Sequence, residues 1–257
     1  MLRREVLKLA LSTALVTAMQ RVHALVPATG QGVFRRYPQD GADLIVPQDR
    51  PFAAKGLGET PLGTTLLIRT RTEQPLHYHR ERLEVAFVLQ GQGRLVAGGK
   101  ETPITSGQII VIPPMTAHAF IGELDLLSRF SPRLMGDVVF VQEGSGPQEG
   151  APLLLSFKPP EVPQDRPFAA SPLANAPLAT VLAVATRSGQ PWHYHKSKDE
   201  QIYVLGGQGI AQVELDRQKV GPGSVVLVPA GAIHQFQGNL QFLSVFSPAL
   251  MGDVVFL

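Results

Sequence analysis

The alternation of hydrophobic and polar positions along the chain predicts short strands and turns rather than helices. Two apolar runs of strand length, residues 109–112 and 225–228, each follow closely after a glycine and end at a proline. A Gly-Gln-Gly sequence at 91–93, and again at 207–209, comes after an apolar stretch, and we expect a turn at both places. No run of helical period is evident after residue 24. The pattern therefore predicts an all-β protein built from small antiparallel β-barrels, or jelly rolls.

The chain repeats itself at a constant offset of 116 residues. The nine residues Val46–Ala54 recur letter for letter at Val162–Ala170. Residues 46–141 align with residues 162–257 without a gap, and a repeat of this length is a domain rather than a unit of a solenoid. We therefore predict two tandem domains with these boundaries, each long enough to bury a core of its own.

Two further segments lie outside the repeated copies. Residues 142–161 begin with Gly, Pro and Gln and are expected to form a linker, within which the apolar residues 153–157 have the length of an edge strand. Residues 25–45 form an N-terminal segment that has no counterpart in the repeat, and the sequence predicts no fold for it.

Residues 1–24 have the features of a signal peptide. Arg3 and Arg4 precede an apolar stretch of about 11 residues, too short to span a bilayer that needs about 20. A small-residue cleavage site follows at residues 22–24. The paired arginines resemble the twin-arginine export signal, although the residues around them depart in part from its pattern. We expect recognition by the export machinery and a periplasmic or secreted protein with no stable membrane anchor after cleavage; an ordinary secretory signal or an amphipathic first helix are the alternatives.

The composition of the chain excludes cysteine chemistry and argues against a nucleic acid partner. With 44% hydrophobic and 17% charged residues, 25 glycines and 22 prolines, the chain has the composition of a turn-rich globular protein. It has no cysteine, which excludes disulfides, thiolate ligands and a cysteine nucleophile. The formal net charge is +2, but residues 1–24 contribute +3 through four basic side chains and one acidic one, so the remainder carries −1. We therefore expect no nucleic acid partner.

Six of the seven histidines fall at equivalent positions of the two copies. In an extended strand, His-x-His directs both imidazoles to one face, and a glutamate five residues later can return to that face from the next strand. Three imidazoles and one carboxylate suit a first-row divalent metal ion. The sequence therefore predicts two metal sites, which consist of His77, His79, Glu84 and His118 in the first copy and of His193, His195, Glu200 and His234 in the second.

The same residues resemble the two sequence motifs of the cupin superfamily. The first motif, His-x-His with four intervening residues before a glutamate and six more before a glycine, is met at His77–Gly91 and at His193–Gly207. The second motif, Gly-x5-Pro-x-Gly-x2-His, is met in full at Gly223–His234, whereas Gly107–His118 has Met115 in place of the inner glycine. The resemblance implies a two-domain protein, a bicupin, with one mononuclear metal centre in each barrel.

The twin-arginine route exports proteins that have already folded, so the metal ion can be bound in the cytoplasm before export. Copper and zinc bind most N/O sites more tightly than manganese or iron does. A protein that folds around its metal in the cytoplasm, where copper and zinc are scarce, can retain the weaker binder. We therefore expect Mn(II) or Fe(II) in each domain.

Alternation along the strands also predicts what surrounds each centre. Side chains two positions apart share a face, so apolar residues should point inward beside the ligands. These inward positions are Ala86, Val88 and Phe120 in the first copy and Ile202, Val204 and Phe236 in the second. We expect the phenylalanines to fill the barrel core rather than to stack on a substrate.

The resemblance leaves several functions open. The first is a metal-dependent oxidoreductase of the quercetinase-like dioxygenase type, in which Glu84 or Glu200 is a ligand that also acts as a base; the apolar pocket favours an aromatic small-molecule substrate. The second is a manganese oxalate decarboxylase or oxidase. For that activity the resemblance implies an arginine three residues before the first histidine, where this chain has Gln74 and Gln190.

The third is a module that binds a metal or small ligand without catalysis. The presence of all eight ligands favours an enzyme over such a module. An isomerase of sugar-like substrates is a further alternative with no feature in its favour, and the oligomeric state is left open by the sequence.

Overall fold

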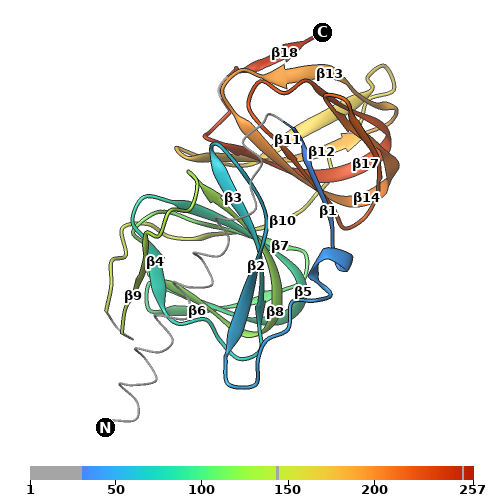
Figure 1. Cartoon of the computed structure of the whole chain (residues 1–257). Helices are drawn as coiled ribbons and strands as arrows, with labels where there is room; N and C mark the ends of the chain where they lie inside the picture. Colours follow the sequence, from blue (N-terminus) through green and yellow to red (C-terminus); the bar gives the residue numbers. More distant parts are fainter. Residues whose placement is uncertain (1–30, 143–144, 251) are drawn as a thin grey trace.

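The computed structural model describes residues 31–142, 145–250 and 252–257, so the signal peptide expected at residues 1–24 lies outside the described residues. The described residues form two nine-stranded antiparallel sheets, each of which curls into a barrel (Figure 1). The prediction of an all-β fold with two tandem barrels is confirmed. Within the described ranges, no helix is long and apolar enough to cross a membrane.

The elements follow the repeat. A short strand and one turn of 3₁₀ helix come first: β1 (Val33–Arg36) and η1 (Gln39–Gly41). The strands of the first copy are β2 (Phe52–Thr60), β3 (Gly63–Thr70), β4 (His77–His79), β5 (Leu83–Ala97), β6 (Lys100–Thr105), β7 (Gln108–Ile112), β8 (His118–Ser131) and β9 (Val138–Phe140). The linker contributes β10 (Leu153–Ser156), and the second copy contains β11 (Phe168–Ala176), β12 (Ala179–Thr186), β13 (Gly189–His195), β14 (Asp199–Val213), β15 (Asp216–Val220), β16 (Ser224–Val228), β17 (His234–Ser247) and β18 (Val254–Phe256).

Each sheet contains one strand from outside its own copy of the repeat. β1 pairs with β16 of the second barrel, with Val33 opposite Leu227. β10 pairs with β7 of the first barrel, with Leu153 opposite Val111. Because Leu227 and Val111 are equivalent positions of the repeat, the two added strands occupy the same place in each sheet. The edge strand expected in the linker is therefore present, and the N-terminal segment extends the sheet of the C-terminal barrel (Figure 1).

The prediction of turns at residues 91–93 and 207–209 is wrong. Strands β5 and β14 run through both segments, and each has a β-bulge a few residues earlier. At Gly91 the backbone has φ +94°, and a Cβ there would overlap the carbonyl group of Glu123 on β8. The glycines permit a bulge and a close approach between strands instead of ending the strand.

The two barrels pack against each other through the outer faces of their sheets. A buried apolar cluster spans both, and within it the ring of Phe87 on β5 lies 5.1 Å from that of Tyr203 on β14. Arg129 of β8 is fully buried at this interface, where its guanidinium lies 3.8 Å from the carboxylate of Asp199 in the other barrel. It also donates a hydrogen bond of 3.3 Å to the hydroxyl of Ser247 on β17. Apolar packing and a buried polar contact therefore join the two halves.

Candidate metal centres

Three strands bring the predicted ligands of each barrel together. In the first barrel, β4 carries His77 and His79, and His77 lies directly opposite His118 at the start of β8. Glu84 lies near the start of β5, which pairs with the far part of β8. Strands β13, β14 and β17 place the second group in the same way, namely His193, His195, Glu200 and His234. All eight side chains are buried.

The ligand atoms of each group converge. One nitrogen or oxygen from each of the four residues lies within 4.8 Å of the others, in both groups. In the first barrel, Glu84 Oε2 is 3.2 Å from His118 Nε2 and 3.5 Å from His79 Nε2. In the second, Oε2 of Glu200 is 3.2 Å and 3.4 Å from the equivalent atoms of His234 and His195. The structure thus brings together every residue of the two predicted sites.

Backbone carbonyls fix the orientation of four of the six imidazoles. Nδ1–H of His77 donates to the carbonyl of Pro75 at 2.8 Å, and Nδ1–H of His118 donates to that of Thr116 at 2.8 Å. The same contacts with the residue two positions earlier are made by His193 and His234. Because Nδ1 carries the proton in these contacts, Nε2 is left free to bind a metal ion.

A buried serine holds one oxygen of each glutamate. Ser128 Oγ donates a hydrogen bond of 2.6 Å to Oε1 of Glu84, and Ser244 Oγ donates one of 2.6 Å to Oε1 of Glu200. Oε2 is therefore the oxygen that faces the histidines. The sequence alone did not identify these serines, because the pairings that place Ser128 opposite Ala86 and Ser244 opposite Ile202 join strands distant in the sequence.

Burial and mutual contact set the charge of the ligands. Burial, with a smaller effect of the neighbouring imidazoles, lowers the pKa of His77 well below its usual value and that of His193 to about 4. Burial alone would raise the pKa of Glu84 and of Glu200, but contacts from the histidines outweigh this effect and lower both pKa values. At neutral pH these two imidazoles are neutral and both carboxylates are ionised, which is the state that binds a divalent cation.

Aromatic rings and aliphatic side chains surround both groups. Phe120 and Phe236 are fully buried within the interior clusters, and their ring centroids lie 6.1 Å from His118 and 6.3 Å from His234. They fill the core, as predicted. The other inward positions expected from strand alternation also belong to these clusters, namely Ala86, Val88, Ile202 and Val204.

Two glutamines have buried polar side chains in the barrels, Gln74 in the first and Gln190 in the second. Gln190 lies opposite Phe236 in the pairing of β13 with β17, so its side chain shares the inward face. In the first barrel, the backbone N–H of Gln74 donates to the carbonyl of Phe120. The side-chain amide oxygens of both glutamines are buried without a hydrogen-bond partner.

Both groups fit a divalent ion. Nε2 of His79 and of His195 is buried and has no hydrogen-bond partner, a condition that a bound metal ion would relieve. Three imidazole nitrogens and one carboxylate oxygen form the donor set that Mn(II), Fe(II) and zinc accept.

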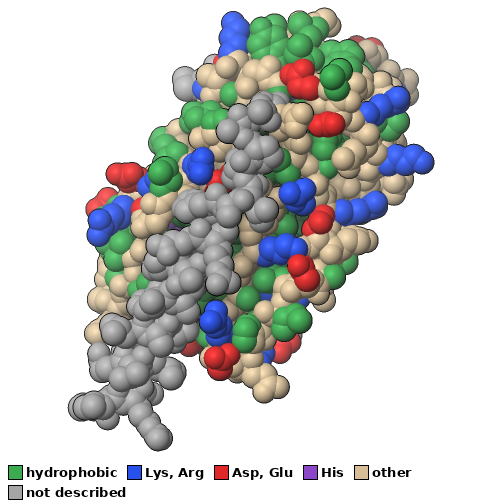
Figure 2. All heavy atoms as spheres, viewed as in Figure 1, with side chains coloured by type: hydrophobic (Ala, Val, Ile, Leu, Met, Phe, Trp, Pro, Cys, Tyr) green, Lys and Arg blue, Asp and Glu red, His purple; other side chains and the backbone are tan. Residues whose placement is uncertain are grey.

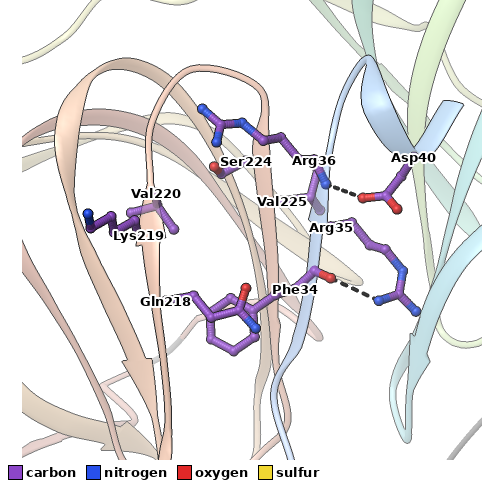
Figure 3. A pocket seen from close by; sticks show the side chains of 9 residues that line it. All are labelled: Phe34, Arg35, Arg36, Asp40, Gln218, Lys219, Val220, Ser224 and Val225. Atoms are coloured by element: carbon purple, nitrogen blue, oxygen red, sulfur yellow. Dashed lines mark hydrogen bonds between the residues drawn. The ribbon is translucent and has the colours of Figure 1, made fainter. Parts of the chain in front are cut away.

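A surface pocket lies apart from these groups. Its volume is about 180 Å³, and it forms where β1 docks against the second barrel (Figure 3). Its charged lining residues include Arg35, Arg36, Asp40 and Lys219, and none of the eight ligand residues lines it. Over the face shown in Figure 2, the described basic and acidic side chains are mixed without a continuous basic surface.

Comparison with known proteins places this arrangement in a class. The family model described as "Cupin domain" matches residues 66–125 and 180–246, one segment in each barrel. With two such domains and two 3-His/1-Glu groups, the chain is a bicupin.

The solved structures that resemble it include oxalate decarboxylases. That of Bacillus subtilis at pH 4.6 superposes with a TM-score of 0.62 and 13% identity, over 90% of this chain and 80% of that one. The formate complex of the Lactobacillus farciminis enzyme gives a TM-score of 0.64 and 14% identity, over 90% of both chains. At this level of identity the likeness shows a shared fold.

Two curated relatives match shorter stretches. An uncharacterized protein of Aquifex aeolicus is 28% identical over 83 residues, which are 31% of this chain and 69% of that protein. An uncharacterized protein of Streptomyces coelicolor is 40% identical over 55 residues, or 20% of this chain and 52% of that protein. Neither relative supplies an activity.

Proposed function

We propose that this bicupin is a metal-dependent enzyme that converts a small organic substrate, with Mn(II) or Fe(II) held in each barrel. The observation that carries the proposal is the pair of complete, buried N3O groups whose ligands are oriented by backbone carbonyls and by serines. Catalysis by a bound ion requires ligands held in this way. Manganese has independent support, because the structurally similar Bacillus subtilis oxalate decarboxylase is described as having Mn(II) centres.

Each group of residues has a proposed role. The three imidazoles and one oxygen of Glu84 or Glu200 would hold the ion, which supplies Lewis-acid polarisation of a substrate carboxylate or enolate. The two glutamates stay ionised at neutral pH and are the proposed catalytic bases. The amides of Gln74 and Gln190 would orient the substrate through neutral hydrogen bonds, and the apolar walls exclude water.

Two chemistries fit this class. The fold likeness supports oxalate decarboxylation or oxidation more directly than any other reaction. Dioxygenation of an aromatic or enol-type substrate has the support of the apolar interior and of the two neutral glutamines. In the described part of the chain, no lysine or arginine makes a hydrogen bond or ion pair with Glu84 or Glu200. An oxalate substrate would therefore have to place its second carboxylate without a charged partner in contact with those ligands.

The test combines metal analysis with two assays. Purified chain should contain manganese or iron in both barrels, and His77→Ala and His193→Ala should each lose the ion of one barrel. The Mn(II)- and Fe(II)-loaded protein is then given oxalate, with detection of formate, CO2 and hydrogen peroxide, and aromatic enols, with detection of O2 consumption. Turnover of oxalate assigns the first chemistry, and O2-dependent loss of an aromatic enol assigns the second. A protein that retains only zinc, or no metal, and turns over neither substrate contradicts the proposal and favours a binding module.

We also propose that the protein is exported through the twin-arginine route. The paired arginines, the short apolar stretch and the small residues near position 24 support this proposal. Replacing Arg3 and Arg4 by lysine should keep the protein in the cytoplasm, as cell fractionation would show. Unchanged export of that variant would indicate an ordinary secretory signal instead.

A further inference from the structure

We propose that Asp137 is a positioning residue that makes the metal centre of the first barrel bind its ion more tightly than that of the second. The starting observation concerns the two imidazoles that no backbone carbonyl anchors. Nδ1 of His79 and Nδ1 of His195 are both buried without a hydrogen-bond partner. The surroundings of these two atoms differ between the barrels.

In the first barrel, a carboxylate faces the unanchored imidazole. Asp137 Oδ1 lies 3.9 Å from His79 Nδ1, and it too is buried without a partner. Leaving two buried polar atoms unpaired costs about 1–3 kcal/mol for each group, so a small rotation of the ring toward the carboxylate is favoured. The pair is therefore close to forming a carboxylate–imidazole–metal arrangement.

The other oxygen of Asp137 is already held. Oδ2 lies 3.0 Å from the guanidinium of Arg82 and accepts a hydrogen bond of 3.3 Å from the backbone N–H of Glu81. Arg82 is itself fixed, because its Nε donates to the carbonyl of Arg133 at 3.0 Å. The loop between β4 and β5, which contains Glu81 and Arg82, thus binds Oδ2 of Asp137 and leaves Oδ1 free to accept a hydrogen bond from His79.

The second barrel lacks this arrangement because its sequence differs at two positions. Asp253 is the counterpart of Asp137, but Glu81-Arg82 is replaced by Ser197-Lys198. The backbone N–H of Ser197 donates to Asp253 Oδ2 at 2.9 Å, and its hydroxyl donates to Oδ1 at 3.3 Å. Both carboxylate oxygens of Asp253 therefore accept hydrogen bonds from Ser197, in the loop between β13 and β14. Within the described residues, no nitrogen–oxygen distance of 4.0 Å or less joins His195 to the carboxylate of Asp253, in contrast to His79 and Asp137.

The consequence is unequal affinity at two centres whose ligands are identical. A carboxylate behind a metal-bound imidazole fixes its tautomer and raises its basicity, and loss of such a partner typically weakens metal binding by about 10–100-fold. The first centre should therefore keep its ion at a free metal concentration that empties the second. This inference rests on metal binding as proposed above, but not on the reaction.

The experiment measures each centre separately in the full chain. His193→Ala retains the first centre and His77→Ala retains the second, and Mn(II) is titrated into each protein with free Mn(II) followed by its EPR signal. The first centre should show the lower Kd. Adding Asp137→Asn should raise the Kd of the first centre by about 10–100-fold, because the amide oxygen turns to Arg82 and an NH2 group then faces Nδ1–H. The matched control, Asp253→Asn in the His77→Ala protein, should leave the Kd of the second centre unchanged.

A reciprocal variant covers the case in which Asp137→Asn does not fold. Ser197→Glu with Lys198→Arg transfers the loop of the first barrel to the second and should lower the Kd of the second centre. An unchanged Kd after Asp137→Asn, equal losses from Asp137→Asn and Asp253→Asn, or no gain from the transfer would each overturn the inference. Failure of the proposed function looks different, since neither single-centre protein would then bind Mn(II) at all.

Discussion

Replacing Arg129 by alanine should destabilise the whole protein, because this side chain joins the two barrels. Arg129 and its partner Asp199 are both fully buried at the interface. Without the guanidinium, the remaining donors to the Asp199 carboxylate among the described residues are the backbone N–H groups of Leu62 and Ala230. Removing one member of a buried ion pair typically costs about 3–5 kcal/mol. We expect the free energy of unfolding to fall by that amount.

Urea unfolding of the metal-free chain measures this change. Far-UV circular dichroism reports on both barrels, whereas the fluorescence of the single tryptophan, Trp192 on β13, reports on the second barrel alone. Coincident transitions by the two probes would show that the barrels unfold as a unit. The control is Arg94→Ala, which breaks an exposed pair with Glu101 and should cost at most about 1 kcal/mol.

A double-mutant cycle with Asp199→Asn isolates the interaction between the two charges. Asparagine removes the charge; its single amide oxygen can accept from one of the two backbone donors, and its NH2 group then faces the other. Because this cost is present with and without Arg129, it cancels in the cycle, and the coupling energy with Arg129→Ala should fall in the range of about 0.5–3 kcal/mol. If Arg129→Ala costs no more than Arg94→Ala, the reasoning is refuted. The apolar cluster at the interface would then hold the barrels together without the polar contact.

Three further predictions concern the candidate metal centres and the interface between the barrels. Burial lowers the folded-state pKa of His193 to about 4 from its ordinary value of 6.5. Because the unfolded chain therefore takes up this proton at a higher pH, the metal-free protein should have its full stability above pH 6.5 and lose about 3 kcal/mol as the pH falls toward 4. Urea unfolding over that range, with His193→Gln as the comparison, measures the loss, and an equal slope in both proteins would contradict it. Ser128→Ala and Ser244→Ala should each change the EPR spectrum of Mn(II) in one barrel only, because Oε1 of the glutamate loses its hydrogen bond, whereas unchanged spectra would show that the serines do not orient the ligand. Gly63→Ala should lower the stability by about 1–3 kcal/mol, since its Cβ would overlap the guanidinium of Arg129; a thermal midpoint equal to that of the parent would indicate that the arginine moves aside freely.

The grouping of three histidines and a glutamate in each barrel could be predicted from the sequence, because it follows from strand geometry and from the repeat. His-x-His directs both imidazoles of a strand to one face whatever the rest of the fold does, and the repeat placed the third histidine and the glutamate in register twice. The structure brings together all four residues of each set. Strand alternation was equally sufficient for the inward apolar positions such as Phe120 and Phe236.

Features that depend on contacts distant in the sequence could not be predicted in this way. The pairing of Val33 with Leu227 joins residues nearly two hundred positions apart, and no local pattern identifies it. The glycines at 91–93 have the composition of a turn, but the approach of Glu123 from β8 makes them part of a continuous strand. A local signal for flexible backbone does not distinguish these two uses of glycine.

Because the repeat has no gap, each residue of one barrel has an equivalent in the other, and the positions that differ identify properties that only one barrel has. The eight residues of the two candidate metal centres are the same in both copies, so these residues alone would leave the barrels equivalent. Arg129 and Asp199 correspond to Val245 and Leu83, which lie in the apolar cluster of the same interface. The ion pair is thus present at only one of the two equivalent positions of the interface. The interface is therefore asymmetric, whereas two apolar pairs would make it symmetric. The change from Arg82 to Lys198 alters the support of one metal-site histidine in the same manner, so the asymmetry of this bicupin lies in residues that surround its ligands.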